Sequence, residues 1–409
     1  EPLSPAIQRD PETGMRIGYL VPEWPGQTHA FFWREITALR ELGHSVYPFS
    51  TKRPPEEACL HGFVTEARET THYVFPPRPQ AVARILATRP GGAAAALAYA
   101  ASLTESSVAD RLNVAALIAC AADLAARCDA LAIDHLHVHS CANAAHIAAM
   151  AHLLKGPSYS LTLHGDLPVY GTDHRQKMKN ARFVSAVTRP LQKQVLDATA
   201  LGEERVPVIW MGVDTERFKP DPDRTPTTGP FTMATIARLN AAKGHSYALA
   251  ALKRVRDKGL DVRYTIAGEG PHRAEIERTI SDLGLEQAVT LAGSFSEKNV
   301  LALLQSADAF VLSSVGLGEA APVSIMEAMS CGLPVICSCI GGTEDMITDR
   351  HSGLLVAQKD VDGLAEAVEA LARNPKLRHR LGQSAREQSQ RAFDYRITAG
   401  KLADAFARA

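Results

Sequence analysis

The sequence predicts an α/β protein with two Rossmann-like, doubly wound domains that face a central cleft. Its 409 residues exceed what one hydrophobic core usually serves. Strand-like and helix-like patterns alternate in two successive series, and a proline-rich stretch separates the two. Such alternation is typical of parallel sheets with right-handed crossovers. Because ligands of these sheets bind beyond the carboxyl ends of the strands, we expect a ligand site between the domains.

The first series predicts an N-terminal domain over residues 15–214. Residues 1–14 are polar and proline-rich without periodicity, so we expect a disordered leader there. The domain opens with a strand, a helix that Gly43 closes, and a second strand, which together form a βαβ unit. The strands expected in this domain are 16–21, 45–49, 135–139, 158–164, 182–186 and 206–210.

Residues 79–132 form an alanine-rich stretch with leucine and isoleucine at helical spacing on both sides of a break at residues 90–92. Two or three packed helices fit this pattern. Packing against other protein elements is the favoured interpretation of their apolar surface, and contact with lipid headgroups is the alternative.

The second series predicts a C-terminal domain over residues 231–392. Residues 215–230 hold four prolines and are interpreted as the linker between the domains. Residues 393–409 are expected to form a terminal helix that returns to the N-terminal domain. The strands expected in the second domain are 231–236, 262–267, 289–292, 309–312 and 334–338.

Bulk composition favours a protein that acts on small molecules. A formal net charge of -1 gives no electrostatic reason to expect nucleic acid as a partner. The seven cysteines are scattered, mostly in apolar runs, as expected of buried thiols in a reducing compartment. No apolar run reaches the ~20 residues of a membrane-spanning helix, and no signal peptide is recognised, so we expect a cytoplasmic protein.

Glu319 and Glu327 are separated by seven residues around the start of a predicted helix. Pro322 suits the first helical position, which places Glu319 in the preceding loop and Glu327 inside the helix. The helix start offers backbone N–H groups near Ala321 and Val323 to a phosphate. Glu327 stands among apolar residues, where an unpaired carboxylate is costly, and two sugar or ribose hydroxyls would satisfy it.

Arg238 and Lys243 follow the first predicted strand of the C-terminal domain. The carboxyl end of that strand faces the cleft, and two cations five residues apart in a tight loop can flank one diphosphate. There they would stabilise the negative charge that builds on a departing nucleoside diphosphate. Taken alone, the pair has a simpler interpretation as solvated surface charge.

Two further motifs end strands at the same cleft. His164 ends a predicted strand of the N-terminal domain, on the opposite wall, and Gly165 beside it allows close backbone approach. Residues 267–271, AGEGP, form a strand-to-helix turn in which Gly268 and Gly270 could admit a base or a phosphate. Taken alone, such a histidine is more often a satisfied polar residue, and G-x-G is more often a plain turn.

Together these motifs resemble the retaining glycosyltransferases of family 4, which have the GT-B fold. The R-x4-K loop, the AGEGP turn and the E-x7-E spacing occur in the family's order within residues 236–356. The resemblance runs from residue 16 to the C-terminus. Residues 26–42 are similar to the subgroup that makes bacterial exopolysaccharide, on the basis of Gln27, Thr28, Phe31, Arg34 and Glu35.

The resemblance implies a role for each motif. The expected catalytic residues are Arg238 and Lys243, which would hold the diphosphate, Glu319, which would contact the transferred sugar, and His164, which would lie near the anomeric carbon. Glu327 would take the ribose hydroxyls, and the acceptor would bind on the N-terminal domain. The other residues expected to bind the donor are Gly26, Gln27, Gly268, Glu269, Gly270, Ser294, Phe295, Ala321, Pro322 and Val323.

The function expected is retaining transfer of a sugar from a UDP- or GDP-sugar to a hydroxyl of a lipid-linked or oligosaccharide acceptor, in polysaccharide or glycolipid synthesis. A lipid-linked acceptor would bring the protein into peripheral contact with the inner face of the membrane. No metal or other cofactor is expected: the D-x-D sequences at 221–223 and 360–362 end no strand at the cleft, and Arg238 and Lys243 supply the positive charge.

Other functions fit the same two-domain plan. A sugar-nucleotide epimerase or a phosphorylase would use the same fold, and a non-catalytic subunit that binds a sugar nucleotide would use the same pocket. An NAD-dependent dehydrogenase is disfavoured, because neither domain has G-x-G-x-x-G after its first strand.

Overall fold

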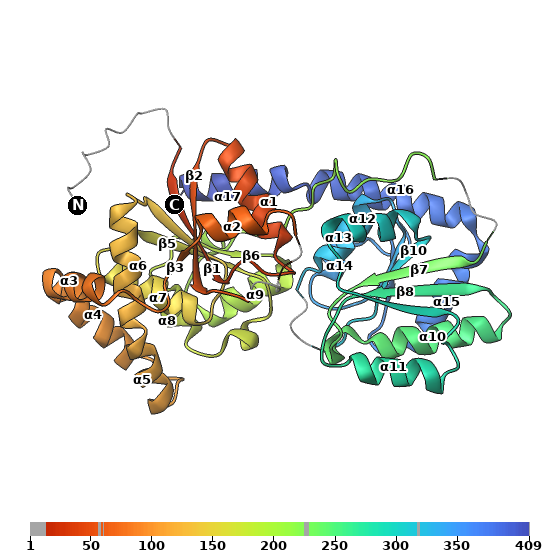
Figure 1. Ribbon diagram of the computed structural model, residues 1–409, viewed down its shortest axis with the longest axis horizontal. Helices are drawn as coiled ribbons and strands as arrows, with labels where there is room; N and C mark the ends of the chain where they lie inside the picture. Colours follow the sequence, from red (N-terminus) through yellow and green to blue (C-terminus); the bar gives the residue numbers. More distant parts are fainter. Residues whose placement is uncertain (1–13, 56–58, 60, 225–228, 317–319, 409) are drawn as a thin grey trace.

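The computed structural model describes residues 14–55, 59, 61–224, 229–316 and 320–408. In this part of the chain, two lobes lie side by side (Figure 1). Each lobe is built on a six-stranded sheet. The predicted leader, apart from residue 14, lies outside the described residues, and so does Glu319.

The first lobe contains a parallel sheet with the strand order β3-β2-β1-β4-β5-β6. Its strands are β1 (Arg16–Glu23), β2 (Ser45–Lys52), β3 (His72–Tyr73), β4 (His135–Val138), β5 (Ser158–Leu163) and β6 (Val184–Ala186). Its helices are α1 (Ala30–Glu41), α2 (Val64–Thr70), α3 (Pro79–Thr88), α4 (Pro90–Ala101), α5 (Val108–Ala116), α6 (Ile118–Ala130), α7 (Asn143–Leu153), α8 (His174–Met178) and α9 (Arg189–Ala198), with 3-10 turns at Leu167–Tyr170 and Glu203–Arg205.

The second lobe repeats this plan with the strand order β12-β11-β10-β7-β8-β9, again all parallel. Its strands are β7 (Phe231–Ile236), β8 (Val262–Ala267), β9 (Val289–Gly293), β10 (Ala309–Leu312), β11 (Val335–Ser338) and β12 (Leu354–Val356). Its helices are α10 (His245–Asp257), α11 (Arg273–Asp282), α12 (Glu297–Ser306), α13 (Val323–Ser330), α14 (Thr343–Met346), α15 (Val361–Arg373) and α16 (Pro375–Ala392), with a 3-10 turn at Ala241–Lys243.

Counted from its own first strand, each sheet has the doubly wound order 3-2-1-4-5-6. The order reverses between β1 and β4 in the first sheet and between β7 and β10 in the second. A crevice opens at such a reversal, beyond the carboxyl ends of the strands. The predicted fold of two doubly wound α/β domains is confirmed, and the domain limits given above stay predictions.

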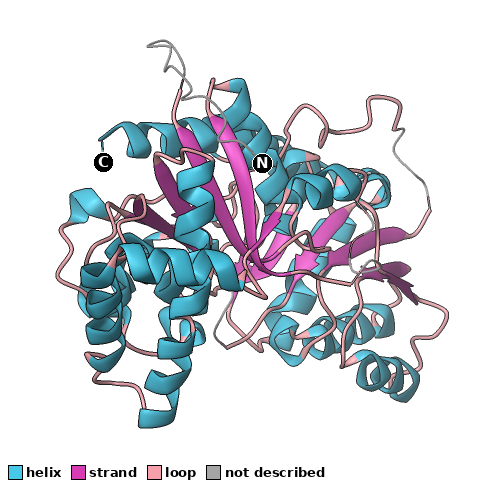
Figure 2. Cartoon of the chain, turned by 60° about the vertical axis from the view of Figure 1, so that its left-hand side comes forward, coloured by secondary structure: helices cyan, strands magenta, loops and turns pink. Residues whose placement is uncertain are grey.

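Helices cover the faces of both sheets (Figure 2). Every residue of β4, β10 and β11 is buried, as expected for parallel strands with helices on both sides. One cluster of buried apolar side chains extends from Leu20 and Phe49 in the first lobe to Leu312 and Met326 in the second. The two lobes therefore share part of one core.

The terminal helix α17 (Tyr395–Arg408) lies on the first lobe although it follows the second in sequence. Figure 1 shows the blue helices α16 and α17 crossing from one lobe to the other. Leu402 and Phe406 of α17 are buried in a cluster with Ile17 of β1 and Ile36 of α1. The last helix thus completes the core of the first lobe.

Three local predictions differ from the structure. The alanine-rich stretch holds the four helices α3 to α6 rather than two or three. The short strands β3 and β12 were not expected. Residues 206–210 form no strand and make only an isolated bridge between Val208 and Ala186. Pro207 lacks the N–H donor that a continuous ladder needs, which accounts for the last difference.

Across the described residues, none of the helices combines the length and the apolar character needed to cross a bilayer. The seven cysteines are free thiols, and all but Cys339 are buried. On α4 and α5, the side chains of Leu97, Val108 and Leu112 are exposed.

Candidate functional site

A cavity of about 890 Å³ lies between the two lobes, and both lobes line it. This volume is within the range of ligand pockets, roughly 300–1,000 Å³. Of the predicted site residues that the structure describes, all but Gly270 line the cavity. They are Gly26, Gln27, His164, Arg238, Lys243, Gly268, Glu269, Ser294, Phe295, Ala321, Pro322, Val323 and Glu327. The predicted role of Glu319 falls on a residue outside the described part of the chain.

The loop that carries Arg238 and Lys243 is held by short-range contacts at the end of β7. The Asn240 side chain accepts a hydrogen bond from the Lys243 backbone N–H at 3.2 Å. His245, which begins α10, donates from Nε2 to the Arg238 carbonyl at 3.2 Å. Within the described residues, no carboxylate forms an ion pair with Arg238. The loop thus places Arg238 and Lys243 at the wall of the cavity.

Gly244 closes this loop in a left-handed conformation, with φ of +60°. A Cβ atom there would lie 2.0 Å from the carbonyl oxygen of Ser313. The Ser313 hydroxyl also donates to the Gly244 carbonyl at 2.9 Å. Glycine is therefore required for the loop to reach the end of β10.

We expect Gly244→Ala to lower the free energy of unfolding more than Gly259→Ala. Gly259 has a similar left-handed φ of +83° but open space around it. The backbone conformation alone should cost about 1–2 kcal/mol at either position. Crowding against Ser313 should add about 1–3 kcal/mol at Gly244. Urea unfolding of both variants measures the difference, and equal losses would show that the close approach to Ser313 is not needed.

The AGEGP turn packs on the same loop. A Cβ on Gly268, which has φ of +150°, would lie 1.9 Å from the Ala237 carbonyl oxygen. A Cβ on Gly270 would lie 2.3 Å from the Leu239 carbonyl oxygen. Gly270 is not among the cavity-lining residues. Both glycines therefore allow two backbone segments to meet, and only Gly268 is also placed to approach a ligand.

The start of α13 also lines the cavity, beside the Arg238 loop and the AGEGP turn. The helix begins at Val323, with Pro322 as its N-cap residue rather than its first helical residue. Ile325 N–H donates to the Pro322 carbonyl at 3.1 Å, whereas no described backbone carbonyl accepts from the N–H groups of Val323 and Ser324. These two donors at the positive end of the helix dipole line the cavity and suit an anion.

The sequence suggested no protein partner for the carboxylate of Glu327, but the structure provides one. Its Oε1 lies 2.9 Å from Nη2 of Arg34, which comes from α1 of the first lobe. The same Nη2 lies 3.5 Å from Glu297, and Glu297 pairs with Arg217 at 3.0 Å. Burial raises the pKa of Glu327, and the attraction of Arg34 opposes that rise. Arg34 therefore supplies the partner that the apolar sequence around Glu327 does not.

A second contact joins the lobes beside Gly26. The Gln27 side chain donates from Nε2 to the Phe295 carbonyl at 2.7 Å, and the Gln27 carbonyl meets His61 Nε2 at 2.7 Å. A Cβ on Gly26 would lie 2.7 Å from Nδ1 of His29. Gln27 thus ties the first loop to the second lobe, in addition to lining the cavity.

His164 follows β5 on the wall opposite Arg238. Its Nε2 lies 3.1 Å from His139 Nδ1, and its Nδ1 lies 3.3 Å from Met211 Sδ. The backbone N–H of His164 donates to the Tyr170 hydroxyl at 2.9 Å. Burial lowers the pKa of His164 to about 3, so the ring is neutral at physiological pH.

Behind His164, side chains of β4 and β5 form a ladder of hydrogen bonds. His135 contacts the hydroxyls of Ser158 and Ser160 at 2.8 and 2.7 Å. His137 contacts the hydroxyls of Ser160 and Thr162 at 2.7 and 2.8 Å. The alternation of histidines along β4 puts these rings on one face of the sheet, and His139 continues it to the cavity.

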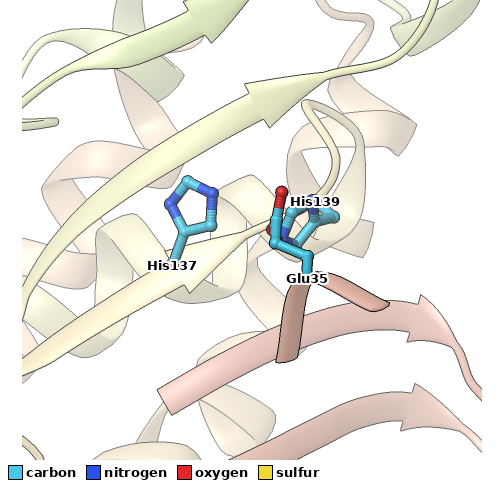
Figure 3. Close-up of side chains that lie close together, drawn as sticks. All are labelled: Glu35, His137 and His139. Carbon is cyan, nitrogen blue, oxygen red and sulfur yellow. The ribbon is translucent and has the colours of Figure 1, made fainter. Parts of the chain in front are cut away.

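Glu35 of α1 approaches this row of histidines (Figure 3). One ligand atom of each of Glu35, His137 and His139 lies within 4.8 Å of the others, which is close enough for a metal ion. Both ring nitrogens of His137, however, already contact hydroxyls. The three residues could hold a metal only if His137 lost one of these partners.

Sequence reasoning assigned no role to Arg34, Glu297 and His139, which all line the cavity. Two of them carried a usable signal. His139 directly follows β4 at the sheet reversal, and Glu297 stands in the first turn of the helix after β9. Arg34 contributed to the resemblance of residues 26–42, but its pairing with Glu327 carried no signal, because the two residues are 293 positions apart.

The fold and the cavity define a two-domain protein of the GT-B type. The HepE protein of Anabaena, solved in complex with UDP and glucose, superposes with a TM-score of 0.74 at 16% identity, over 97% of this chain and 100% of that one. Residues 217–388 match the family Glycosyl transferases group 1. That segment is less than half of the chain, so the match is a similarity of the second lobe to the family. The predicted resemblance to glycosyltransferases of the GT-B fold is confirmed at this level.

Two sequence relatives match this chain over only part of their own length, 42% in one and 65% in the other. The putative colanic acid biosynthesis glycosyltransferase of Escherichia coli is 35% identical over 173 residues, 41% of this chain and 42% of that protein. The GDP-mannose-dependent alpha-(1-6)-phosphatidylinositol monomannoside mannosyltransferase of Mycolicibacterium smegmatis is 29% identical over 253 residues, 58% of this chain and 65% of that protein.

Proposed function

We propose that this chain is a retaining glycosyltransferase that uses a UDP- or GDP-sugar and no metal. The observation that carries the proposal is the meeting of Arg238, Lys243 and the start of α13 in one cavity between the lobes. Two cations and two helical N–H groups match the charge and the oxygen atoms of a pyrophosphate. His164 lies on the opposite wall, where a sugar attached to that pyrophosphate would extend.

The reaction breaks the bond between the anomeric carbon and the phosphate oxygen, and a bond from the acceptor oxygen to that carbon forms on the same face. The proton of the acceptor hydroxyl leaves with the diphosphate. Negative charge develops on the departing diphosphate. It is stabilised there by Arg238, Lys243 and the N-terminus of α13. Glu319 contacts the transferred sugar in this proposal, and Glu327 the ribose of the nucleotide.

The acceptor is a hydroxyl of a lipid-linked or oligosaccharide intermediate in polysaccharide or glycolipid synthesis. Both sequence relatives support this, since one is named for colanic acid and the other for a phosphatidylinositol mannoside. The HepE complexes support UDP as the nucleotide, and the mycobacterial relative supports GDP. The exposed apolar side chains on α4 and α5 are available for peripheral contact with a membrane that holds the acceptor.

The test begins with thermal shifts against UDP-, GDP- and dTDP-sugars. A donor present at 100 times its dissociation constant should stabilise the protein by about 2.7 kcal/mol, and a sugar nucleotide of the wrong base should do so much less. The donor that binds is then assayed for release of its nucleoside diphosphate with and without acceptor, in the presence of EDTA.

Acceptor-dependent release that EDTA leaves unchanged is the expected result. Binding without release of nucleoside diphosphate would instead indicate an epimerase or a non-catalytic binding subunit. Release that requires inorganic phosphate would indicate a phosphorylase. Loss of release with EDTA would overturn the metal-independent mechanism.

A further inference from the structure

A chain of buried and partly buried side chains connects Glu35 with the cavity. The Tyr19 hydroxyl donates to Glu35 Oε1 at 2.7 Å. His139 Nε2 lies 3.3 Å from the same oxygen, and His139 Nδ1 lies 3.1 Å from His164 Nε2. His139 and His164 line the cavity, whereas Glu35 lies behind them. The chain therefore runs from a largely buried carboxyl group to the wall of the proposed active site.

The groups around Glu35 leave its charge uncompensated. Tyr19 faces it from β1, His137 from β4 and His139 from the residue after β4, with His164 beyond in the loop after β5. The helix α17 contributes the uncharged ring of Phe406, which lies 5.2 Å from the His137 ring. In the described part of the chain, no arginine or lysine forms an ion pair with Glu35. The side chains around Glu35 carry no positive charge that would compensate its own.

The contact between His139 and His164 fixes a relation between their tautomers. One of the two facing nitrogens must carry the proton, and the other must accept it. An ionised Glu35 favours a proton on His139 Nε2, because that nitrogen lies 3.3 Å from Glu35 Oε1 and makes no hydrogen bond of its own. His139 Nδ1 then accepts from His164 Nε2–H, which leaves His164 Nδ1 unprotonated. If Glu35 is protonated, this preference is lost and His139 Nδ1 donates to His164 Nε2 instead. His164 Nδ1 then carries the proton beside Met211.

We infer that Glu35, acting through His139, selects the tautomer that His164 presents to the cavity. This inference deepens the proposed function and rests on it for its role in the reaction. When Glu35 takes up a proton, the proton of His139 moves from Nε2 to Nδ1, and the proton of His164 moves from Nε2 to Nδ1. Only the charge of Glu35 changes, and both rings stay neutral. Glu35 and His139 are positioning residues, and His164 is the group that meets the substrate.

Burial supports this assignment of the charge change to Glu35. It raises the pKa of Glu35 to about 7, while it lowers the pKa of His139 well below its usual value and that of His164 to about 3. A tautomer change near neutral pH therefore reports on the carboxyl group. The hydrogen bond from Tyr19 holds the pKa of Glu35 lower than burial alone would.

The test follows the ring nitrogens of His164 by ¹⁵N NMR of the full chain, with the resonances assigned by their loss in His164→Gln. In the unmodified protein, we expect the protonated nitrogen to change from Nδ1 to Nε2 as the pH rises through about 7. In Glu35→Gln this change should vanish, because the amide does not titrate. Glu41→Gln, an exposed change on the same helix, should leave it intact.

Tyr19→Phe gives a second measurement in case Glu35→Gln does not fold. It keeps the ring and removes the donor to Glu35, so the tautomer change should move to higher pH. A tautomer that does not respond to pH, or that responds equally in Glu35→Gln, would overturn the inference. The inference would also be overturned if the purified protein contained one equivalent of a transition metal and Glu35→Gln lost it. A bound metal, and not Glu35, would then fix the orientation of these rings.

Activity separates this inference from the proposed function. If the chain transfers sugar, Glu35→Gln should remove the ionisation near pH 7 from the pH profile of kcat and leave the KM for the donor within about 2-fold. If no transfer is found while the NMR results hold, the proposed function fails and the link between Glu35 and His164 stands.

Discussion

Replacing Lys243 with alanine should lower turnover about 100-fold or more, the range seen when one preorganised partner of a developing charge is removed. Lys243 lines the cavity beside Arg238, in a loop that Asn240 and Gly244 hold in place. Its charge would act mainly on the departing diphosphate, where negative charge grows as the bond breaks. The measurement is nucleoside diphosphate release at saturating donor and acceptor.

Lys298→Ala is the matched control, since Lys298 is exposed on α12 of the same lobe and is not a cavity residue. It should keep near-normal turnover. Thermal unfolding of both variants checks that the fold is intact. Near-normal turnover of Lys243→Ala would remove this residue from the mechanism, whereas a loss confined to KM would limit its role to ground-state binding.

Arg34→Met should destabilise the protein by roughly 3–5 kcal/mol, as is typical when one partner of a buried ion pair is removed. The change leaves the buried carboxylate of Glu327 without its partner at 2.9 Å. Glu297 keeps its contact with Arg217. Arg40→Met, on the same helix with a more exposed side chain, should change stability by only about 0.5 kcal/mol. Urea unfolding measures both variants.

The loss of unfolding free energy in Arg34→Met should depend on pH in a definite direction. Without Arg34, burial keeps the pKa of Glu327 raised and no attraction opposes it. A folded-state pKa above the unfolded value, about 4.3, favours the protonated folded form. The destabilisation should therefore be small near pH 4, grow as the pH rises, and level off above the folded pKa. A second change, Glu327→Gln, should recover part of it at neutral pH. A loss that is equal at pH 4 and pH 7 would contradict this account.

Much of the fold could be predicted because parallel strands covered on both faces are continuous apolar runs. The bounds of β7, β8 and β10 agree with those expected from the sequence. The strands β3 and β12 were missed because two or three residues give too little pattern to recognise. The wrong strand at 206–210 had the right apolar content, but Pro207 sits within it.

The candidate site was predictable where position in the chain determines position in space. Arg238 and His164 each follow a strand, and the carboxyl ends of the strands meet at the cavity. The partner of Glu327 could not be predicted in this way. Arg34 reaches it from α1 of the other lobe, and a contact between lobes depends on how two finished domains are placed together.

The path of α17 has a consequence for biosynthesis. Because Leu402 and Phe406 fill the core beside β1, the half of the chain that leaves the ribosome first lacks part of its interior until the final helix emerges. Its apolar surface beneath α1 stays uncovered while the second lobe is being translated. A fragment cut between the lobes would have the same defect, so we expect such a fragment to aggregate unless the final helix is supplied as a separate peptide.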